Sequence, residues 1–228
     1  MTIVREASGC SVASVARPQM KAEVRVRGPA SGPAVICVNG GQAAAVAGTW
    51  SASLEWLVER LAPRFPGLQF AEVRYRVKSW NRLDSCVEDG REAIRAVAAR
   101  RTLLVGFSMG GAVAALCADE PPVQVVVGLA PWLPEQLPLG ALRERRFVVV
   151  HGSLDRALPG IPGVSAASSR RGFARAQALG VEGDYAVVRG AVHGLALRAP
   201  RGTPVPLPGA RRLAARIESE IARFAHRS

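Results

Sequence analysis

The sequence predicts an α/β fold built on a doubly wound, mostly parallel sheet with helices on both faces. The first observation is that strand-like and helix-like segments alternate through most of the 228 residues. The second is that several strand-like segments, such as 34–38 and 123–129, are continuous apolar runs. Runs of this kind are typical of strands whose two faces are both covered by helices. Together they favour a parallel sheet with right-handed crossover connections.

The expected elements follow from hydrophobic periodicity. The expected strands are short and mostly apolar, and they span 22–27, 34–38, 70–75, 102–107, 123–129, 147–151 and 185–188. The expected helices repeat apolar residues at helical spacing, over 53–61, 83–99, 109–117, 168–179 and 210–224. Either Ser51 or Ser53 is expected to cap the first helix.

We expect one domain without a separate cap. The chain is 49% hydrophobic and 21% charged, and it is long enough to bury a large core. Residues 1–20 have little periodicity and are expected to form a loose lead-in, so that 21–228 form the domain. The proline-containing pieces 131–138 and 200–208 are expected to be ordered loops at the edge of the sheet. The gap 132–146 is too short for a cap, so a fairly open site is predicted.

The formal net charge of +12 raises the question of a nucleic-acid partner. The arginines are scattered in short clusters, and aromatic residues do not interleave with them as base-stacking platforms would. We therefore expect no nucleic-acid partner and interpret the charge as a solvated arginine surface. A preference for anionic substrates stays open.

The cysteines and the N-terminal region are informative about the expected cellular location of the protein. The four cysteines are widely spaced and contain no C-x-x-C pair, which favours neither a zinc site nor a disulfide framework. Cys37 and Cys117 lie in apolar patterns and are expected to be buried. Arg5 and Glu6 interrupt any signal-like apolar segment, and no stretch approaches the ~20 apolar residues of a membrane span. A reduced, cytoplasmic setting is expected.

The segment Gly106-Phe107-Ser108-Met109-Gly110 lies between an expected strand and an expected helix. A G-x-S-x-G sequence in this setting indicates a nucleophile elbow, a sharp turn that exposes the serine hydroxyl at the edge of the sheet. Such a turn crowds the backbone, so side chains two residues away on either side need to be nearly absent. Ser108 is therefore the predicted nucleophile. A purely structural turn serine is the alternative, and it is disfavoured because so strained a turn is costly without a function.

A serine nucleophile needs a base, which in sites of this kind is a histidine. The chain has three histidines. His193 follows the last expected strand, His151 ends an earlier strand, and His226 lies near the C-terminus as a surface group. His193 is the predicted base.

The base in turn needs an acid that orients it. Asp155 follows the strand 147–151, which gives the order Ser, Asp, His along the chain that goes with a nucleophile elbow. Glu135, beyond the strand 123–129, is the main rival acid. Asp184 precedes its strand and would point to the wrong edge of the sheet.

The chain resembles the α/β-hydrolase family at four places. They are Asn39-Gly40-Gly41 after an early strand, GFSMGG at 106–111, HGSLD at 151–155 and AVHG at 191–194. The resemblance implies that Asp155 is the triad acid, that His193 is the base and that His151 is structural. It also implies a serine esterase or thioesterase without a cap domain.

The resemblance further implies an oxyanion hole, the set of donors that stabilises a developing oxyanion. Met109 N–H, at the start of a helix, is the first expected donor. Gly41 N–H in the early loop is the candidate for the second, with Gln42 close behind. Asn39 stands where the family commonly has histidine, and it can still hydrogen-bond the loop.

Four residues are candidates for binding the substrate. Trp132 and Leu133 follow the strand 123–129 and are candidates for an acyl pocket, although core or loop packing is their commoner role. Gln42 and Trp50 are candidates from the early part of the chain.

The predicted function is hydrolysis of an ester or thioester of a small acyl substrate through an acyl-enzyme on Ser108. No metal or organic cofactor is expected. An acyltransferase on the same triad and a non-catalytic binding protein of this fold are the alternatives. The substrate, the acyl acceptor and the oligomeric state are left undecided by the sequence.

Overall fold

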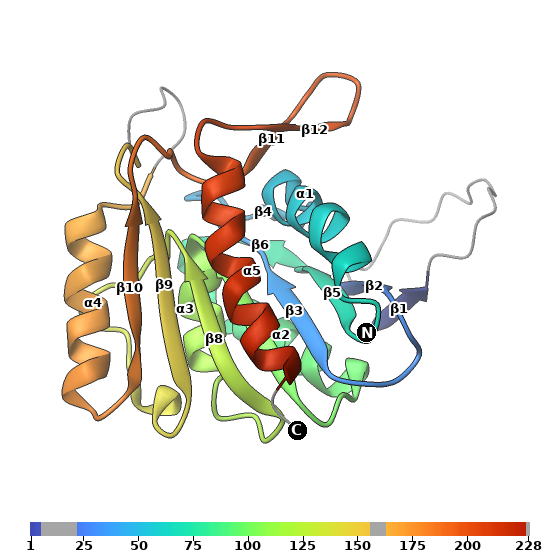
Figure 1. Cartoon of the computed structure of the whole chain (residues 1–228), viewed down its shortest axis with the longest axis horizontal. Helices are drawn as coiled ribbons and strands as arrows, with labels where there is room; N and C mark the ends of the chain where they lie inside the picture. The colour runs from blue at the N-terminus through green and yellow to red at the C-terminus, as the bar shows by residue number, and fades with distance from the viewer. Residues whose placement is uncertain (6–21, 156–162, 227–228) are drawn as a thin grey trace.

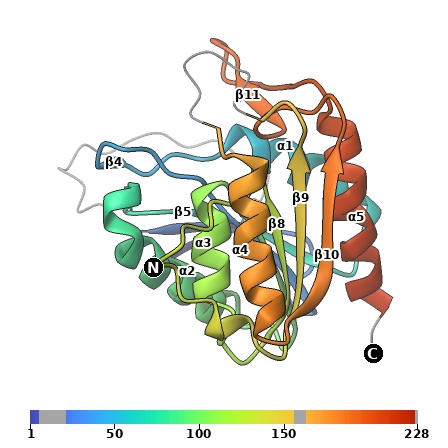
Figure 2. The same ribbon diagram turned by 90° about the vertical axis from the view of Figure 1, so that its left-hand side faces the viewer.

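The computed structural model describes residues 1–5, 22–155 and 163–226. An eight-stranded sheet runs through the molecule and helices cover both of its faces (Figures 1 and 2). Within this sheet, all neighbouring strands are parallel except one pair. The predicted fold class is therefore confirmed.

The strands of the sheet lie in an order that differs from their order in the chain. From one edge to the other they are β1 (Thr2–Arg5), β2 (Glu23–Arg27), β5 (Gln69–Arg74), β3 (Ala34–Val38), β7 (Thr102–Phe107), β8 (Val123–Leu129), β9 (Arg146–Gly152) and β10 (Glu182–Val188). The antiparallel pair is β2 with β5. The early strand β3 lies beside β7, so the loop after β3 and the turn after β7 emerge at the same end of the sheet.

The helices form two layers. The helices α1 (Ala52–Leu61) and α5 (Ala210–His226) lie on one face, and α2 (Leu83–Val97), α3 (Met109–Leu116) and α4 (Ala166–Ala178) lie on the other (Figure 2). Successive side chains of a strand point to opposite faces. In β3, Ile36 accordingly packs in the core under α2, α3 and α4, whereas Val35 and Cys37 pack in the core under α1 and α5.

Several details agree with the sequence-based expectations. Ser51 is the N-cap of α1, and its hydroxyl accepts a hydrogen bond from Leu54 N–H at 3.4 Å. Cys37 and Cys117 are buried, as predicted. Cys10 lies outside the described residues. No helix among the described residues has both the length and the apolar character needed to cross a membrane.

Other elements were not predicted. Within the expected lead-in, Thr2–Arg5 form β1, whereas residues 6–20 lie outside the described part of the chain. Part of the segment 200–208, expected to be a loop, forms β12 (Pro204–Pro206), which pairs with β11 (Ala196–Arg198) as an antiparallel hairpin. The short elements are β4 (Val46–Ala47), which pairs with β6 (Val77–Lys78), and the 3₁₀ turns η1 (Ala62–Arg64), η2 (Trp80–Arg82) and η3 (Gly140–Leu142).

Candidate active site

Ser108 occupies a strained turn between β7 and α3. Its backbone has φ 55° and ψ −119°, a left-handed φ that non-glycine residues rarely adopt and that clusters at functional sites. The turn is held by backbone hydrogen bonds on both sides. Ser108 N–H donates to Leu129 O at 3.0 Å, and Ser108 O accepts from Gly111 N–H and Trp132 N–H, both at 2.9 Å.

The glycines around Ser108 are required by close backbone contacts. A Cβ at Gly106 would lie 2.2 Å from Gly110 O, and a Cβ at Gly110 would lie 2.2 Å from Val38 O. A Cβ at Gly111 would lie 2.3 Å from Pro131 Cβ. Real side chains do not tolerate such distances, so the turn after β7 packs against β3 and the segment after β8 only because these residues are glycine.

His193 and Asp155 form a hydrogen-bonded pair beyond the ends of β10 and β9. The His193 Nδ1 atom lies 2.9 Å from Asp155 Oδ2. Both side chains are nearly inaccessible to solvent, at 5% and 2% exposure. The ring of His193 also packs on the ring of Phe107, with centroids 5.0 Å apart. This contact places the imidazole beside the residue that precedes Ser108.

Asp155 is surrounded by donors. Its Oδ1 atom accepts a hydrogen bond from Val164 N–H at 2.8 Å, and its Oδ2 atom lies 3.1 Å from His151 Nε2 as well as near His193. Burial tends to raise the pKa of Asp155, but the hydrogen bonds from His151 and His193 outweigh it and hold the pKa below its ordinary value. The carboxylate is therefore the favoured form in the fold.

His151 is a buried structural partner of Asp155. Its Nε2 atom lies 3.0 Å from Val164 O, and its Nδ1 atom lies 3.1 Å from Ser169 Oγ. A carbonyl oxygen only accepts hydrogen bonds, so Nε2 of His151 carries a proton. His151 is fully buried and does not line the cavity that contains Ser108.

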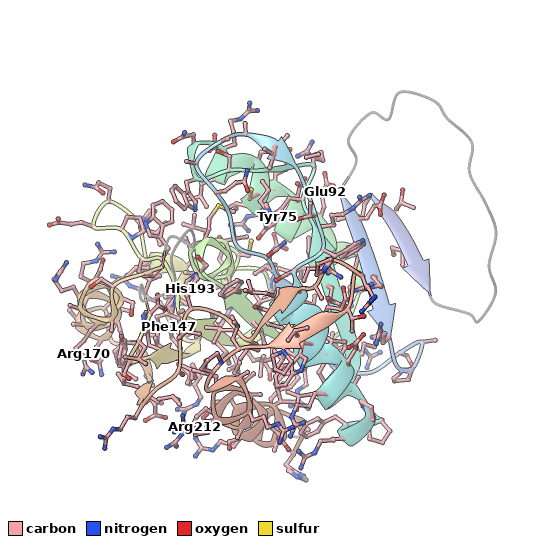
Figure 3. All side chains as sticks on the ribbon, turned by 90° about the horizontal axis from the view of Figure 1, so that it is seen from above. Tyr75, Glu92, Phe147, Arg170, His193 and Arg212 are labelled. Atoms are coloured by element: carbon pink, nitrogen blue, oxygen red, sulfur yellow. The ribbon has the colours of Figure 1, made fainter. Side chains whose placement is uncertain are left out.

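Ser108 and His193 line the same cavity, which has a volume of about 400 Å³. The cavity opens at the end of the sheet where parallel strands finish, the usual place for sites in open α/β sheets. His193 lies near the middle of this end when the molecule is viewed from above (Figure 3). The loop after β3 also lies at this cavity, because a Cβ at Gly40 would lie 3.3 Å from Ser108 Cβ.

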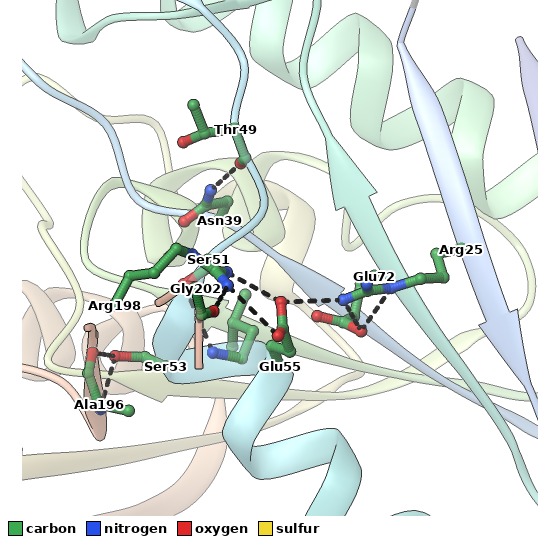
Figure 4. Close-up of polar contacts among 11 residues, drawn as sticks. Arg25, Asn39, Thr49, Ser51, Ser53, Glu55, Glu72, Ala196, Arg198 and Gly202 are labelled. Carbon is green, nitrogen blue, oxygen red and sulfur yellow. Dashed lines mark hydrogen bonds and ion pairs between the residues drawn. The ribbon is translucent and has the colours of Figure 1, made fainter. Parts of the chain in front are cut away.

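The backbone N–H groups near Ser108 differ in whether they already donate a hydrogen bond within the protein. Gly40 N–H donates to Asn39 Oδ1 at 2.7 Å. Asn39 Nδ2 in turn donates to Thr49 O at 2.8 Å (Figure 4). Within the described residues, the N–H groups of Met109 and Gly41 have no acceptor. Met109 and Gly41 are therefore free to donate to a ligand, and Asn39 organises the loop as anticipated.

The predicted substrate-binding residues divide into two groups. Gln42 and Trp50 line the cavity of Ser108 and His193, but Trp132 and Leu133 do not. Leu133 is a correction to the sequence-based expectation: it is buried in the core, against Gly172 of α4. The backbone N–H of Trp132 donates to Ser108 O, and its side chain packs against the core.

The rival acids do not line the cavity that contains Ser108 and His193. Glu135 is exposed and lines a different cavity, together with Leu133. Asp184 lies in β10 and forms an ion pair with Arg146. His226 is an exposed residue at the end of α5.

Sequence reasoning missed several cavity residues, among them two cations and a leucine. Lys78 comes from the short strand β6, and Leu197 and Arg198 come from the hairpin strand β11. Strands of two or three residues carry too little periodicity to be recognised. The one available signal was position, since β11 begins three residues after His193.

Comparisons with known proteins identify structural relatives. No protein-family model and no curated protein matches the sequence. Among solved structures, a sugar hydrolase from Lactococcus lactis aligns with a TM-score of 0.66 and 17% identity, over 93% of this chain and 97% of its own. A dienelactone hydrolase from Anabaena variabilis aligns with a TM-score of 0.63 and 14% identity, over 94% of this chain and 97% of its own. An alpha/beta hydrolase from a deep-sea metagenome aligns with a TM-score of 0.58 and 18% identity, over 85% and 86%. At these identities the likeness concerns the fold.

Proposed function

Because the chain has the α/β-hydrolase fold, we propose that it is a serine hydrolase that cleaves an ester or thioester of a small substrate through an acyl-enzyme on Ser108. One observation carries the proposal. Ser108 lies in a strained turn and lines the same cavity as His193, and the Nδ1 atom of His193 is hydrogen-bonded to the buried carboxylate of Asp155. These are the three roles that nucleophilic catalysis by serine requires.

His193 acts as the general base in this proposal. Its Nδ1–H donates to Asp155, so Nε2 is the nitrogen left to take the proton of Ser108 as the hydroxyl attacks the carbonyl carbon. Asp155 stays ionised, holds the imidazole in this tautomer and stabilises the imidazolium that forms. The low pKa of Asp155 supports this role, because the carboxylate persists while His193 gains a proton.

The amides of Met109 and Gly41 are the proposed oxyanion donors. Both lack an acceptor among the described residues, whereas Gly40 N–H is occupied by Asn39. Met109 begins α3, where backbone N–H groups are free and the helix dipole favours negative charge. Two such donors stabilise the oxyanion that develops when the carbonyl becomes tetrahedral.

The cycle closes by hydrolysis of the acyl-enzyme. The imidazolium of His193 protonates the leaving oxygen or sulfur atom as the bond between that atom and the carbonyl carbon breaks. An alcohol or a thiol is released. A water molecule then attacks the acyl-enzyme, and His193 takes its proton. When the carbon–Oγ bond breaks, His193 returns that proton to Ser108. The products are a carboxylic acid and the alcohol or thiol.

The cavity favours small substrates. Its volume of about 400 Å³ lies toward the lower end of the range of about 300–1,000 Å³ for ligand pockets. Trp50, Phe107 and Leu197 supply apolar lining, and Gln42 supplies a polar group.

The test is a panel of acyl esters and their matched thioesters, assayed with the wild-type protein and with Ser108→Ala. Wild-type turnover that is lost in a folded Ser108→Ala protein supports the proposal, and the preferred member of each pair identifies the leaving group. Hydrolysis that survives in Ser108→Ala would remove Ser108 from the mechanism.

A further inference from the structure

The cavity that contains Ser108 and His193 has a cationic lining. Lys78 and Arg198 both line it, and no aspartate or glutamate does so within the described residues. Positive charge beside a reacting carbonyl favours ligands that carry negative charge. The two cations differ, however, in whether a carboxylate of the protein already neutralises them.

Arg198 is neutralised. Its Nη2 atom lies 2.8 Å from Glu55 Oε2, and the same carboxylate is shared with Arg25 at 3.3 Å (Figure 4). Arg198 Nη1 also donates to Gly202 O at 2.6 Å, within the same hairpin. The guanidinium therefore fixes the β11–β12 hairpin to α1, and the carboxylate of Glu55 balances its charge.

Lys78 is not neutralised. Its Nζ atom donates to Thr49 Oγ1 at 3.0 Å, and among the described residues no carboxylate forms an ion pair with it. An ammonium has three donors, so two remain for a ligand. The side chain is half-buried, and this burial lowers the pKa of the ammonium from its ordinary value. An anion bound beside Lys78 would offset the cost of that desolvation.

From this geometry, and resting on the proposed hydrolysis at Ser108, we infer that the site takes substrates that carry an anionic group and that Lys78 binds this group. A carboxylate fits the two remaining donors of the ammonium. It belongs either to the acyl part of the substrate or to the leaving part, and the test distinguishes the two.

The test uses two pairs of esters. In the first pair the anion is on the acyl part: 4-nitrophenyl hydrogen glutarate is compared with its methyl ester. In the second pair it is on the leaving part: 3-acetoxybenzoate is compared with its methyl ester. The readout is the ratio of kcat/KM for the anionic ester to kcat/KM for the neutral ester, so that general damage to the site cancels.

Three variants are compared with the wild type. Lys78→Met removes the charge and keeps the length of the side chain, and Lys78→Arg keeps the charge. Arg143→Met removes a cation close to the opposite end of the sheet, before β9, and controls for the overall field. For at least one pair of esters, we expect Lys78→Met to lower the ratio of kcat/KM values about tenfold, because a hydrogen bond between charged groups is lost. Lys78→Arg should keep most of the preference and Arg143→Met all of it.

A binding measurement separates this inference from the proposed function. The stable amides, glutaric acid mono-4-nitroanilide and 3-acetamidobenzoate, are titrated calorimetrically beside their methyl esters. Lys78-dependent binding of an anionic amide without any Ser108-dependent hydrolysis would uphold the anion site and overturn the hydrolase. Ser108-dependent hydrolysis with ratios and affinities that do not change in Lys78→Met would uphold the hydrolase and overturn the anion site.

Discussion

His193 Nδ1 lies 2.9 Å from Asp155 Oδ2, and the same oxygen lies 3.1 Å from a second imidazole, that of His151. Asp155 therefore receives three donors, because its other oxygen accepts Val164 N–H. A carboxylate held from three sides has a fixed orientation. The orientation of His193 depends on it, so residues with no access to the cavity contribute to the site.

Replacement of His151 tests this indirect contribution. We expect His151→Phe to lower kcat/KM and to destabilise the protein by about 1–3 kcal/mol, because Val164 O and Ser169 Oγ each lose a buried partner. His151→Gln, which retains a donor, should recover part of both losses. Steady-state kinetics and urea unfolding measure the two effects, and unchanged kinetics in His151→Phe would show that His193 does not depend on this contact.

Asp155→Asn tests the carboxylate itself. An amide donor facing Nδ1 favours the wrong tautomer of His193, and a loss of roughly 10⁴-fold in kcat is expected for such a change. Glu135→Gln is the matched control, since Glu135 is exposed and lines a different cavity. If Glu135→Gln were the more damaging of the two, Asp155 would not be the acid.

The stability of the fold should depend on pH through Asp155. Its pKa is lower in the folded chain than its ordinary value of about 3.9. A group of this kind stabilises the fold above its unfolded pKa, and the stabilisation is lost as the pH falls through the folded pKa. We expect the difference in unfolding free energy between wild type and Asp155→Asn to be largest near neutral pH and to shrink below about pH 4. Urea unfolding at a series of pH values measures it, and a constant difference would contradict the account.

The rate of hydrolysis should fall as the solution is acidified. Only a neutral imidazole can accept the proton of Ser108, and imidazoles commonly titrate between about pH 5 and 8. The measurement is kcat/KM across this range with a neutral ester. A profile that stays flat there would mean that His193 is not the base.

Gly110 should not tolerate a side chain. A Cβ at this position would lie 2.2 Å from Val38 O and 2.6 Å from Asn39 O, and both are backbone atoms that cannot rotate away as a side chain could. We expect Gly110→Ala to destabilise the protein by about 1–3 kcal/mol or more. Gly140→Ala is the matched control, because a Cβ there meets no atom within 4 Å. Thermal unfolding compares the two, and equal melting temperatures would contradict the packing described for the turn.

Strong local patterns made much of the fold predictable. The run 34–38 has no polar residue and became a fully buried central strand. The segment around Ser108 was recognisable because close backbone packing demands glycine at fixed positions. The pairing of His193 with Asp155 was anticipated from chain order, since each follows a parallel strand of the sheet.

The lining of the cavity was harder to predict. Leu133 and Leu197 are both apolar residues near strand ends, but one is buried in the core and the other lines the cavity. Which of them faces the cavity depends on tertiary packing that leaves no local pattern. Lys78 was missed for the same reason, since it reaches the cavity from a two-residue strand paired with β4.

Labelling with a fluorophosphonate, followed by peptide mass spectrometry, tests the nucleophile most directly. The reagent phosphonylates a serine that is activated by a base. We expect one covalent adduct, located on Ser108. It should be absent in Ser108→Ala, and it should form much more slowly in a folded His193→Ala protein. An unlabelled wild-type protein, or an adduct on another residue, would contradict this expectation.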